Sequence, residues 1–259
     1  MKLWVVVPAA GLGQRFAQRP NQRQDNKVNQ SSADVDPANP DLPKQYQLLN
    51  GKALIVHTLE RLLSVEPERV VVAIHPQDSH WHTLPMSTDP RVIAVEGGAE
   101  RSDSVLRALL ALAGLAQPDD RVLVHDVARP CITPEDIKQL IRLAGDHPAG
   151  GVLGAAVTDT VKRVDDKGLI LSTEDRGSLW AAMTPQLCRY ALLVSALEQA
   201  RDQGLTITDE ASALEAAGHQ PRVVSGRRDN IKVTYREDMV LAEAILAYQD
   251  SPRSPRQQQ

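Results

Sequence analysis

The sequence predicts an α/β protein with a doubly wound, mostly parallel sheet and a protruding β-arm. Short apolar runs rich in β-branched residues alternate with longer segments of helical periodicity, as expected for parallel strands joined by helices. Apolar residues make up 42% and charged residues 24% of the 259 residues, as in ordinary globular proteins. A hairpin pattern in the second half interrupts the alternation and predicts the arm.

Four runs have the composition of buried strands: residues 3–7, 70–74, 92–95 and 122–124. Aromatic residues make up only 3% of the chain, so Val, Leu, Ile and Ala must fill the core. Ligands of open α/β sheets bind at the carboxyl ends of the strands. The residues that follow each run are therefore the first candidates for a functional site.

Segments with helical periodicity lie between and after these strands. Residues 53–63 place their apolar side chains on one face, and residues 104–115 are apolar nearly all round. Residues 134–143 follow Thr133 as a helix N-cap, with Pro134 at the first helical position. Further predicted elements are helices at 185–200, 209–217 and 237–248 and a short strand at 231–234.

Residues 157–184 predict the arm. Two short apolar runs, 161–164 and 169–171, flank Asp165-Asp166-Lys167-Gly168, which is a good turn sequence. A single domain is expected over residues 1–248. Residues 17–43 hold four each of Asn, Gln, Pro and Asp, and predict a disordered loop insertion. Residues 249–259 predict a disordered tail.

Composition excludes several classes of function. The 29 basic and 33 acidic residues give a net charge of −4, which disfavours nucleic acid as a partner. No apolar run reaches the roughly 20 residues that span a bilayer, and the apolar start is too short for a signal peptide. The two cysteines stand alone, without the spacing of a zinc site or a disulfide framework. A cytoplasmic protein is expected.

The loop after the first strand, Pro8-Ala9-Ala10-Gly11-Leu12-Gly13-Gln14-Arg15-Phe16, suggests phosphate binding. The dinucleotide fingerprint requires Gly or Ala where Phe16 stands, which disfavours a nicotinamide-dependent oxidoreductase. The P-loop fails at Gly51-Lys52-Ala53 in both its last residue and its spacing. The G-x-G-x-R loop of nucleotidyltransferases matches residues 11–15, although an ordinary glycine-rich turn is the alternative for this loop alone.

Six ordered motifs make the similarity specific. They are PAAGLGQR at 8–15, PKQY at 43–46, GGAERSDSV at 97–105, HDVARP at 125–130, TDEAS at 208–212 and NIKVT at 230–234. With them the chain resembles the bacterial 2-C-methyl-D-erythritol 4-phosphate cytidylyltransferases of the non-mevalonate isoprenoid pathway, over residues 3 to about 246. The resemblance implies a Rossmann-like nucleotidyltransferase fold.

The resemblance also implies a reaction in which CMP passes from CTP to methylerythritol phosphate and pyrophosphate is released. The substrate phosphate would attack the α-phosphorus in line and needs no general base, because a phosphate dianion is already a nucleophile. Catalysis then depends on positioning and on positive charge. By resemblance, Arg15 and Lys44 act on the triphosphate and the transition state, and Lys232 contacts the α-phosphate. Asp126 is the expected ligand of Mg²⁺.

Family positions further imply a nucleotide site made of Pro8, Ala9, Ala10, Gly11, Gly13, Gly97, Gly98, Ser104 and Val127. A plain strand-to-helix turn capped by Ser102 is the alternative for the Gly97-Gly98 segment. Ala99 stands where the family often has an acidic residue, so a base contact through that side chain cannot operate here. Val127 replaces a common alanine, and a modest steric adjustment is expected.

The second substrate is assigned, again by resemblance, to Arg129, Thr160, Arg176, Thr184 and Thr208. In the family the arm swaps across a homodimer, so Thr160 and Arg176 could act in cis or in the partner's site. Threonines in strands are more often simple strand formers. Two alternatives of function remain open: a cytidylyltransferase for another polyol phosphate, such as ribitol 5-phosphate, and a non-catalytic nucleotide-binding protein.

Overall fold

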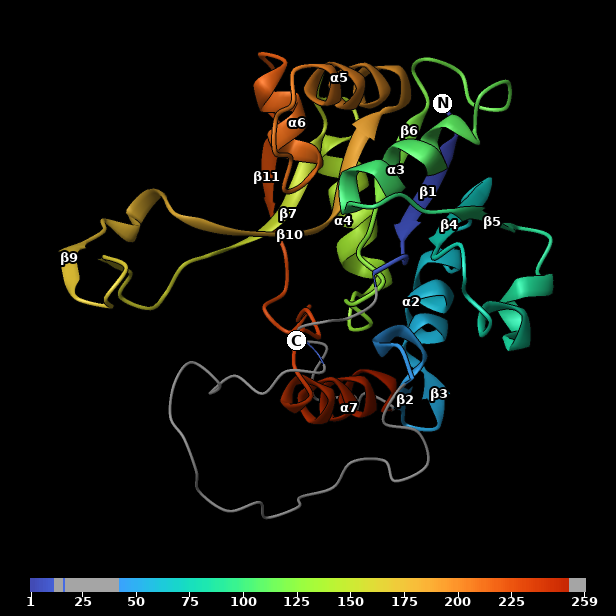
Figure 1. Ribbon diagram of the computed structural model, residues 1–259, viewed down its shortest axis with the longest axis horizontal. Helices are drawn as coiled ribbons and strands as arrows, with labels where there is room; N and C mark the ends of the chain where they lie inside the picture. Colours follow the sequence, from blue (N-terminus) through green and yellow to red (C-terminus); the bar gives the residue numbers. More distant parts are fainter. Residues whose placement is uncertain (12–15, 17–41, 252–259) are drawn as a thin grey trace.

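The computed structural model describes residues 1–11, 16 and 42–251, and its centre is a seven-stranded sheet (Figure 1). The strand order is β11-β7-β10-β6-β1-β4-β5. The strands are β1 (Leu3–Pro8), β4 (Arg69–Ile74), β5 (Val92–Glu96), β6 (Arg121–Val124), β7 (Gly151–Ala156), β10 (Trp180–Arg189) and β11 (Arg222–Ser225). Only β10 runs antiparallel to its neighbours in this sheet, so the predicted mostly parallel arrangement is confirmed.

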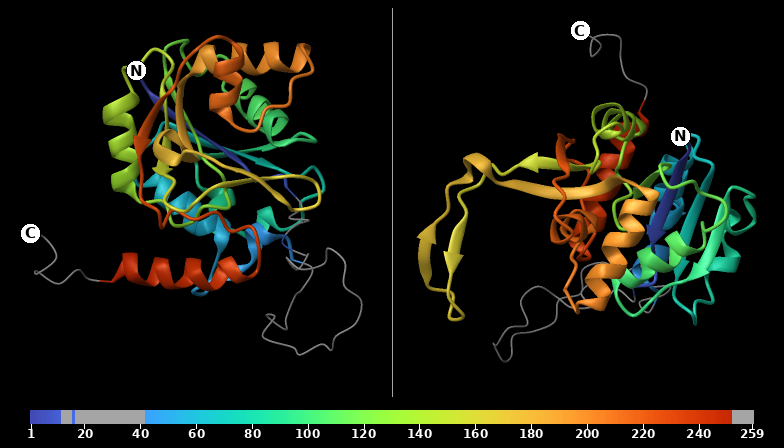
Figure 2. Two further views of the ribbon diagram at one scale, coloured as in Figure 1. Left: turned by 90° about the vertical axis from the view of Figure 1, so that its left-hand side faces the viewer. Right: turned by 90° about the horizontal axis from the view of Figure 1, so that it is seen from above.

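Helices cover both faces of the sheet, as a doubly wound fold requires (Figure 2). One apolar core joins the sheet to α2 (Leu54–Leu63), α4 (Pro134–Ala144) and α7 (Glu237–Asp250). A second core on the opposite face involves α3 (Arg101–Leu110), α5 (Tyr190–Asp202) and α6 (Glu210–Ala216). Aliphatic side chains dominate both cores, as the low aromatic content predicts.

Most of the predicted elements are confirmed, with small shifts at their ends. The four predicted strands are β1, β4, β5 and β6. At the start of α4, Asp136 N–H donates to Thr133 Oγ1 at 3.2 Å, so Thr133 is the N-cap. The helix predicted at 104–115 instead spans Arg101–Leu110, and the residues after it form turns in which Leu112 and Ala116 are buried and Leu115 is exposed.

One predicted element begins too early and another is absent. Residues 185–189 belong to β10 rather than to a helix, and α5 begins only at Tyr190. Pro185 is typical of a helix start, but here the register of β10 against β7 shifts between Ala182 and Gln186, and such an irregularity accommodates proline inside a sheet. Residues 231–234 form no strand; Val233 is buried and its N–H donates to Ala128 O at 2.8 Å. Strands β7 and β11 were not predicted, and of the two only β7 is rich in glycine and alanine, which are poor strand formers.

Two hairpins complete the described chain. The small one pairs β2 (Leu48–Leu49) with β3 (Lys52–Ala53), and its turn holds Asn50 and Gly51 at φ 47° and 82°. The other pairs β8 (Lys162–Val164) with β9 (Ile170–Thr173), with Gly168 at φ 80° in the predicted turn. This second hairpin is the tip of an arm that projects from the body of the protein (Figures 1 and 2).

The predicted insertion at 17–43 lies outside the described residues except for Leu42 and Pro43, as does most of the predicted tail. The tail prediction is too long at its start, because α7 continues to Asp250. Within the described ranges, no helix is long and apolar enough to cross a membrane. Cys131 and Cys188 are both buried and form no disulfide.

Candidate active site

A cavity of about 660 Å³ lies where the carboxyl ends of β1, β4, β5 and β6 meet. The predicted residues that line it are Pro8, Ala9, Ala10, Gly11, Lys44, Gly98, Ser104, Asp126, Val127 and Lys232. Gly13 and Arg15 lie outside the described residues. Ligands of open α/β sheets bind beyond the carboxyl ends of the strands, and most of the residues predicted for the nucleotide line a cavity at that edge.

The two glycine-containing loops are packed tightly against each other. A Cβ on Gly97 would come within 2.3 Å of Ala10 Cβ, and one on Gly98 within 2.2 Å of Asp103 Cβ. Gly97 N–H donates to Ile74 O at 2.7 Å, and Gly98 N–H donates to Ser104 Oγ at 3.0 Å. These glycines are thus required by loop packing, and Gly97 supports the cavity wall from behind.

Ser104 has a structural task in addition to its place in the cavity wall. Its side chain is buried, accepts the Gly98 N–H, and donates to Glu100 O at 3.1 Å. Helix α3 begins at Arg101 with Glu100 as its N-cap, so the alternative in which Ser102 caps the helix is wrong. The hydroxyl of Ser104 fixes the loop from which backbone groups could face a base.

Lys44 lies on the short 3-10 helix η1 (Lys44–Tyr46), directly after Pro43. Its Nζ donates to Val233 O at 2.8 Å, which joins it to the segment that carries Lys232. Two neighbours anchor η1: Gln45 Nε2 donates to Ala9 O at 3.1 Å, and Tyr46 Oη donates to Asp78 Oδ2 at 2.7 Å. The PKQY motif therefore positions its lysine through the two residues that follow it.

Replacing Tyr46 by Phe is expected to lower the free energy of unfolding by about 1–2 kcal/mol, because Asp78 Oδ2 would lose its partner. Burial, together with the hydrogen bond to Asp78, raises the pKa of Tyr46 well above its ordinary value. Urea unfolding measures the change. Tyr248→Phe on exposed α7 is the control and should shift the free energy by less than about 0.5 kcal/mol. Equal effects of the two substitutions would contradict the anchoring role.

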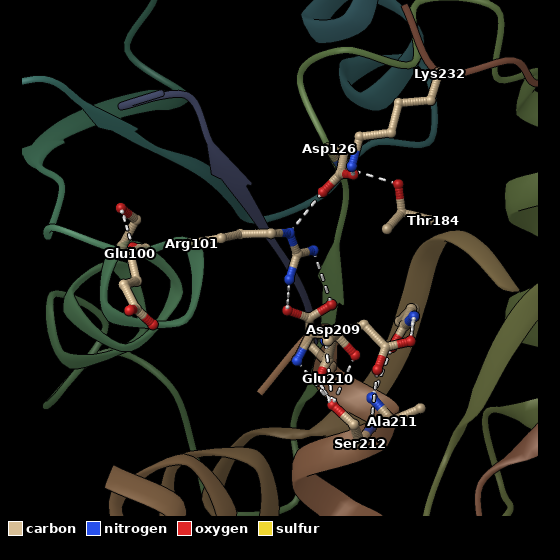
Figure 3. Close-up of polar contacts among 12 residues, drawn as sticks. Glu100, Arg101, Asp126, Thr184, Asp209, Glu210, Ala211, Ser212 and Lys232 are labelled. Carbon is tan, nitrogen blue, oxygen red and sulfur yellow. Dashed lines mark hydrogen bonds and ion pairs between the residues drawn. The ribbon is translucent and has the colours of Figure 1, made fainter. Parts of the chain in front are cut away.

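Asp126 is the electrostatic centre of the cavity (Figure 3). It follows β6, and its two carboxylate oxygens accept from different cations: Arg101 Nε lies 2.8 Å from Oδ1, and Lys232 Nζ lies 2.6 Å from Oδ2. Its backbone N–H donates to Thr184 Oγ1 at 3.0 Å. Burial by itself would raise the pKa of Asp126, but Arg101 and Lys232 outweigh it and hold that pKa far below its usual range. The two cations therefore favour the ionised form of Asp126.

Arg101 connects Asp126 to a second buried carboxylate. Its Nη1 and Nη2 donate to Glu210 Oε1 and Oε2 at 2.7 and 3.1 Å, and the Glu210 side chain is only 1% exposed. Burial disfavours the charged guanidinium, but the two carboxylates outweigh it and raise the pKa of Arg101 above its ordinary value. Lys232, Asp126, Arg101 and Glu210 thus form a chain of alternating charges.

Three polar residues lie beside Asp126 on the side of β10. Arg129 Nη1 donates to Asn230 O at 2.7 Å, and Asn230 Nδ2 donates to Thr184 O at 2.8 Å. Among the described residues, Arg129 Nε and Asn230 Oδ1 are buried atoms without a hydrogen-bond partner. The structure therefore brings the predicted Arg129 and Thr184 next to Asp126, although neither lines the cavity itself.

The other residues predicted for the second substrate lie farther out. Thr208 is exposed just before α6, and Thr160 and Arg176 are exposed on the arm. Arg176 donates to Thr158 O, so it is held at the base of the arm. In this single chain, Thr160, Arg176 and Thr208 are not among the described residues that line the cavity.

The six motifs include Arg101, Glu210 and Asn230, for which the sequence predicts no role. Their charge or polarity, inside segments expected to be buried, was the only feature that could have indicated a role. What could not be read from the sequence was their pairing, since Arg101 and Glu210 are 109 positions apart.

The chain matches known proteins over nearly its whole length. Residues 36–248 match the model of the family described as 2-C-methyl-D-erythritol 4-phosphate cytidylyltransferase. A protein of that name from Hahella chejuensis is 44% identical over 246 residues, covering 95% of this chain and 93% of the relative. The one from Aeromonas hydrophila is 45% identical over 256 residues, covering 98% and 93%.

Solved structures agree with the sequence relatives. A crystal structure of 2-C-methyl-D-erythritol 4-phosphate cytidylyltransferase from Francisella tularensis superposes with a TM-score of 0.76 at 31% identity, covering 95% of this chain and 100% of the other. The one from Thermus thermophilus gives a TM-score of 0.73 at 28% identity, covering 95% and 100%. With these matches the similarity carried by the six motifs is confirmed, and the chain belongs to the 2-C-methyl-D-erythritol 4-phosphate cytidylyltransferase family.

Proposed function

We propose that the protein transfers CMP from CTP to 2-C-methyl-D-erythritol 4-phosphate, giving 4-diphosphocytidyl-2-C-methyl-D-erythritol and pyrophosphate. The observation that carries this proposal is the convergence of Lys44, Lys232 and Asp126 on one cavity at the carboxyl ends of the parallel strands. Family membership supplies the identity of the two substrates. The geometry supplies positive charge where two anions must meet.

The chain's own residues account for in-line attack of the substrate phosphate on the α-phosphorus. Negative charge accumulates around that phosphorus in the transition state, and fixed cations stabilise it. Lys44 is held by Val233 O and Lys232 by Asp126, so both ammonium groups are oriented before substrate arrives. Arg15 is proposed for the triphosphate from its motif alone.

The nucleotide is proposed to lie along the two loops that form the cavity wall. Pro8, Ala9, Ala10 and Gly11, together with the motif residue Gly13, would face the phosphates through small side chains and backbone N–H groups. Gly98, Ser104 and Val127 would surround the nucleoside, with Gly97 packed behind them against Ala10. Because Ala99 lines the cavity and cannot hydrogen-bond through its side chain, backbone groups would read the cytosine.

A magnesium ion fits the donor set at Asp126. Mg²⁺ is usually held by one or two carboxylates together with substrate phosphates and water, and Asp126 is an ionised carboxylate in the wall of the cavity. The described residues hold no cluster of three or more potential ligands, so the remaining ligands would come from the triphosphate. When bound, the ion would neutralise phosphate charge and orient the triphosphate.

The second substrate is proposed to bind beside Arg129, Thr184 and Thr208. Arg129 Nε is buried and has no hydrogen-bond partner within the described part of the chain, and arginine suits a phosphate. Thr160 and Arg176 would be contributed by the arm of a partner subunit, since they do not line the cavity of their own chain. We accordingly propose one catalytic domain over residues 1–248, with residues 157–184 as a dimerisation arm.

The arm also has the surface of an interface. Val164, Leu169, Ile170 and Leu171 are 51–64% exposed, and an isolated two-stranded hairpin is marginally stable in water. Ile170→Asp is expected to convert the dimer to monomer in sedimentation velocity. The kcat/KM for the polyol phosphate should fall while CTP affinity is largely kept, because the nucleotide cavity belongs to one chain.

Val240→Asp is the matched control for the arm. Val240 is 68% exposed on α7, so the same charge is added to an apolar surface elsewhere. This variant should sediment like the parent protein. An Ile170→Asp protein that stays dimeric would rule out the arm as the interface.

A substrate panel with CTP and Mg²⁺ tests the function itself. Methylerythritol phosphate should release pyrophosphate with a kcat/KM at least about tenfold above that for ribitol 5-phosphate, since a mismatched polar substrate leaves buried groups unpaired. Preference for ribitol 5-phosphate would select the other cytidylyltransferase. Binding of CTP without pyrophosphate release from any substrate would select the non-catalytic alternative.

A further inference from the structure

A buried carboxylate that no part of the proposed reaction uses lies beside the cavity, paired with Arg101 of the cavity wall. Glu210 is the first residue of α6, is 1% exposed, and directs both carboxylate oxygens to Arg101. We infer that Glu210 and Arg101 are a positioning pair that holds the Asp126 carboxylate in place for the transfer. This inference rests on the proposed cytidylyltransferase activity and adds two positioning residues to it.

The start of α6 does not need Glu210 for its own hydrogen bonding. Asp209 Oδ1 caps the helix by accepting Ser212 N–H at 2.9 Å (Figure 3). Gln186 satisfies the next group, because its Oε1 accepts Ala211 N–H at 2.8 Å and its Nε2 donates to Asp209 Oδ2 at 2.8 Å. The carboxylate of Glu210 is therefore available for a task outside its own element.

That task is to orient the guanidinium of Arg101. Two of its nitrogens, Nη1 and Nη2, are directed to Glu210, and this leaves Nε directed to Asp126 Oδ1 at 2.8 Å. Without Glu210, a flexible arginine beside a phosphate-binding loop would turn its fork towards the phosphates, because arginine matches phosphate geometry in the same bidentate way. Glu210 thus keeps the Arg101 guanidinium bound to the carboxylates of Glu210 and Asp126, and away from the phosphates of the nucleotide.

The Arg101–Glu210 pair is expected to fix the orientation of the Asp126 carboxylate rather than to change its charge. With Oδ1 fixed by Arg101, the carboxylate turns Oδ2 towards Lys232, whose side chain is 38% exposed. A buried ion pair such as Arg101–Glu210 contributes little net stability, because the desolvation of both groups offsets their attraction. We expect that loss of the Arg101–Glu210 pair mainly lowers kcat and leaves CTP binding largely unchanged.

Glu210→Gln is the first test. We expect kcat to fall about 10- to 100-fold, as for other groups that support an active-site ligand, with the Kd for CTP changed less than about twofold. The matched control is Gln186→Met, which removes two hydrogen bonds from the same helix start but leaves the Arg101–Glu210 pair in place. It should lower Tm and keep kcat within about threefold. Equal losses of kcat in both variants would mean that Glu210 only anchors α6, and would overturn the inference.

A double-mutant cycle gives an independent readout. If Glu210 acts through Asp126, then Glu210→Gln should lower kcat in an Asp126→Asn background by less than about twofold. Arg101→Lys keeps the charge but cannot reach both carboxylates, and should reproduce the loss seen with Glu210→Gln. It also serves as the test variant if Glu210→Gln does not fold. The inference would be overturned if Glu210→Gln and Asp126→Asn lowered kcat independently, so that their fold-losses multiplied in the double variant. An unchanged kcat in Glu210→Gln or in Arg101→Lys would also overturn it.

The outcome separates this inference from the proposed function. A parent protein that binds CTP but transfers CMP to no polyol phosphate would refute both. A parent protein with full activity and a Glu210→Gln variant of equal kcat would refute the positioning role alone.

Discussion

Lys44→Ala is expected to lower kcat by about 10²-fold or more while the protein folds normally. The lysine lines the cavity, and its ammonium group is one of the few fixed cations available to a transition state that gathers negative charge. Folding should be unaffected, because Gln45 and Tyr46 anchor the backbone of η1 independently of the lysine side chain. Pyrophosphate release under saturating substrates measures kcat, and thermal unfolding monitors the fold.

Lys52→Ala is the matched control for Lys44→Ala. Lys52 lies on β3 only eight positions away along the chain, and its ion pair with Glu60 at 2.9 Å is exposed. Exposed pairs contribute at most about 1 kcal/mol, so this variant should keep both kcat and most of its stability. If Lys44→Ala kept its turnover within about threefold of the parent protein, Lys44 would not be a catalytic cation.

The sequence predicts the parts of this fold that depend on local patterns. The runs that became β1, β4, β5 and β6 are apolar because both faces of a parallel sheet are covered. Their alternation with helices then places Asp126 and the glycine loops at one edge of the sheet. Strand β10 escaped prediction because its identity depends on two neighbours from distant parts of the chain, which outweigh the helical character of Pro185 and the residues after it.

The same limit applies within the site. The types of residue and their motifs indicated Lys44, Lys232 and Asp126, and the structure brings all three to one cavity. The partners of Asp126 could not be predicted, since Arg101 and Lys232 reach it from positions 25 and 106 residues away. Ion pairs between distant residues depend on how whole helices and strands pack, so they leave no periodic pattern in the local sequence.

Lys232→Ala has the second large expected effect, and its consequences separate it from Lys44→Ala. It should also lower kcat by about 10²-fold or more, because it removes the cation that we propose for contact with the α-phosphate. In addition, Asp126 Oδ2 would lose the ammonium group that lies 2.6 Å from it. An ionised carboxylate without that competing cation should bind Mg²⁺ more tightly, so the Mg²⁺ concentration at half-maximal rate should fall.

Lys44→Ala is the comparison variant for this prediction. The Lys44 Nζ donates to Val233 O, and the described cations that lower the pKa of Asp126 are Arg101 and Lys232. Lys44→Ala should therefore lower kcat without lowering the Mg²⁺ requirement, whereas Lys232→Ala should lower both. Titrating Mg²⁺ at fixed CTP in the two variants measures the difference. An unchanged Mg²⁺ requirement in Lys232→Ala would show that Lys232 and the metal do not share Asp126, and the proposed metal site would have to be placed elsewhere in the cavity.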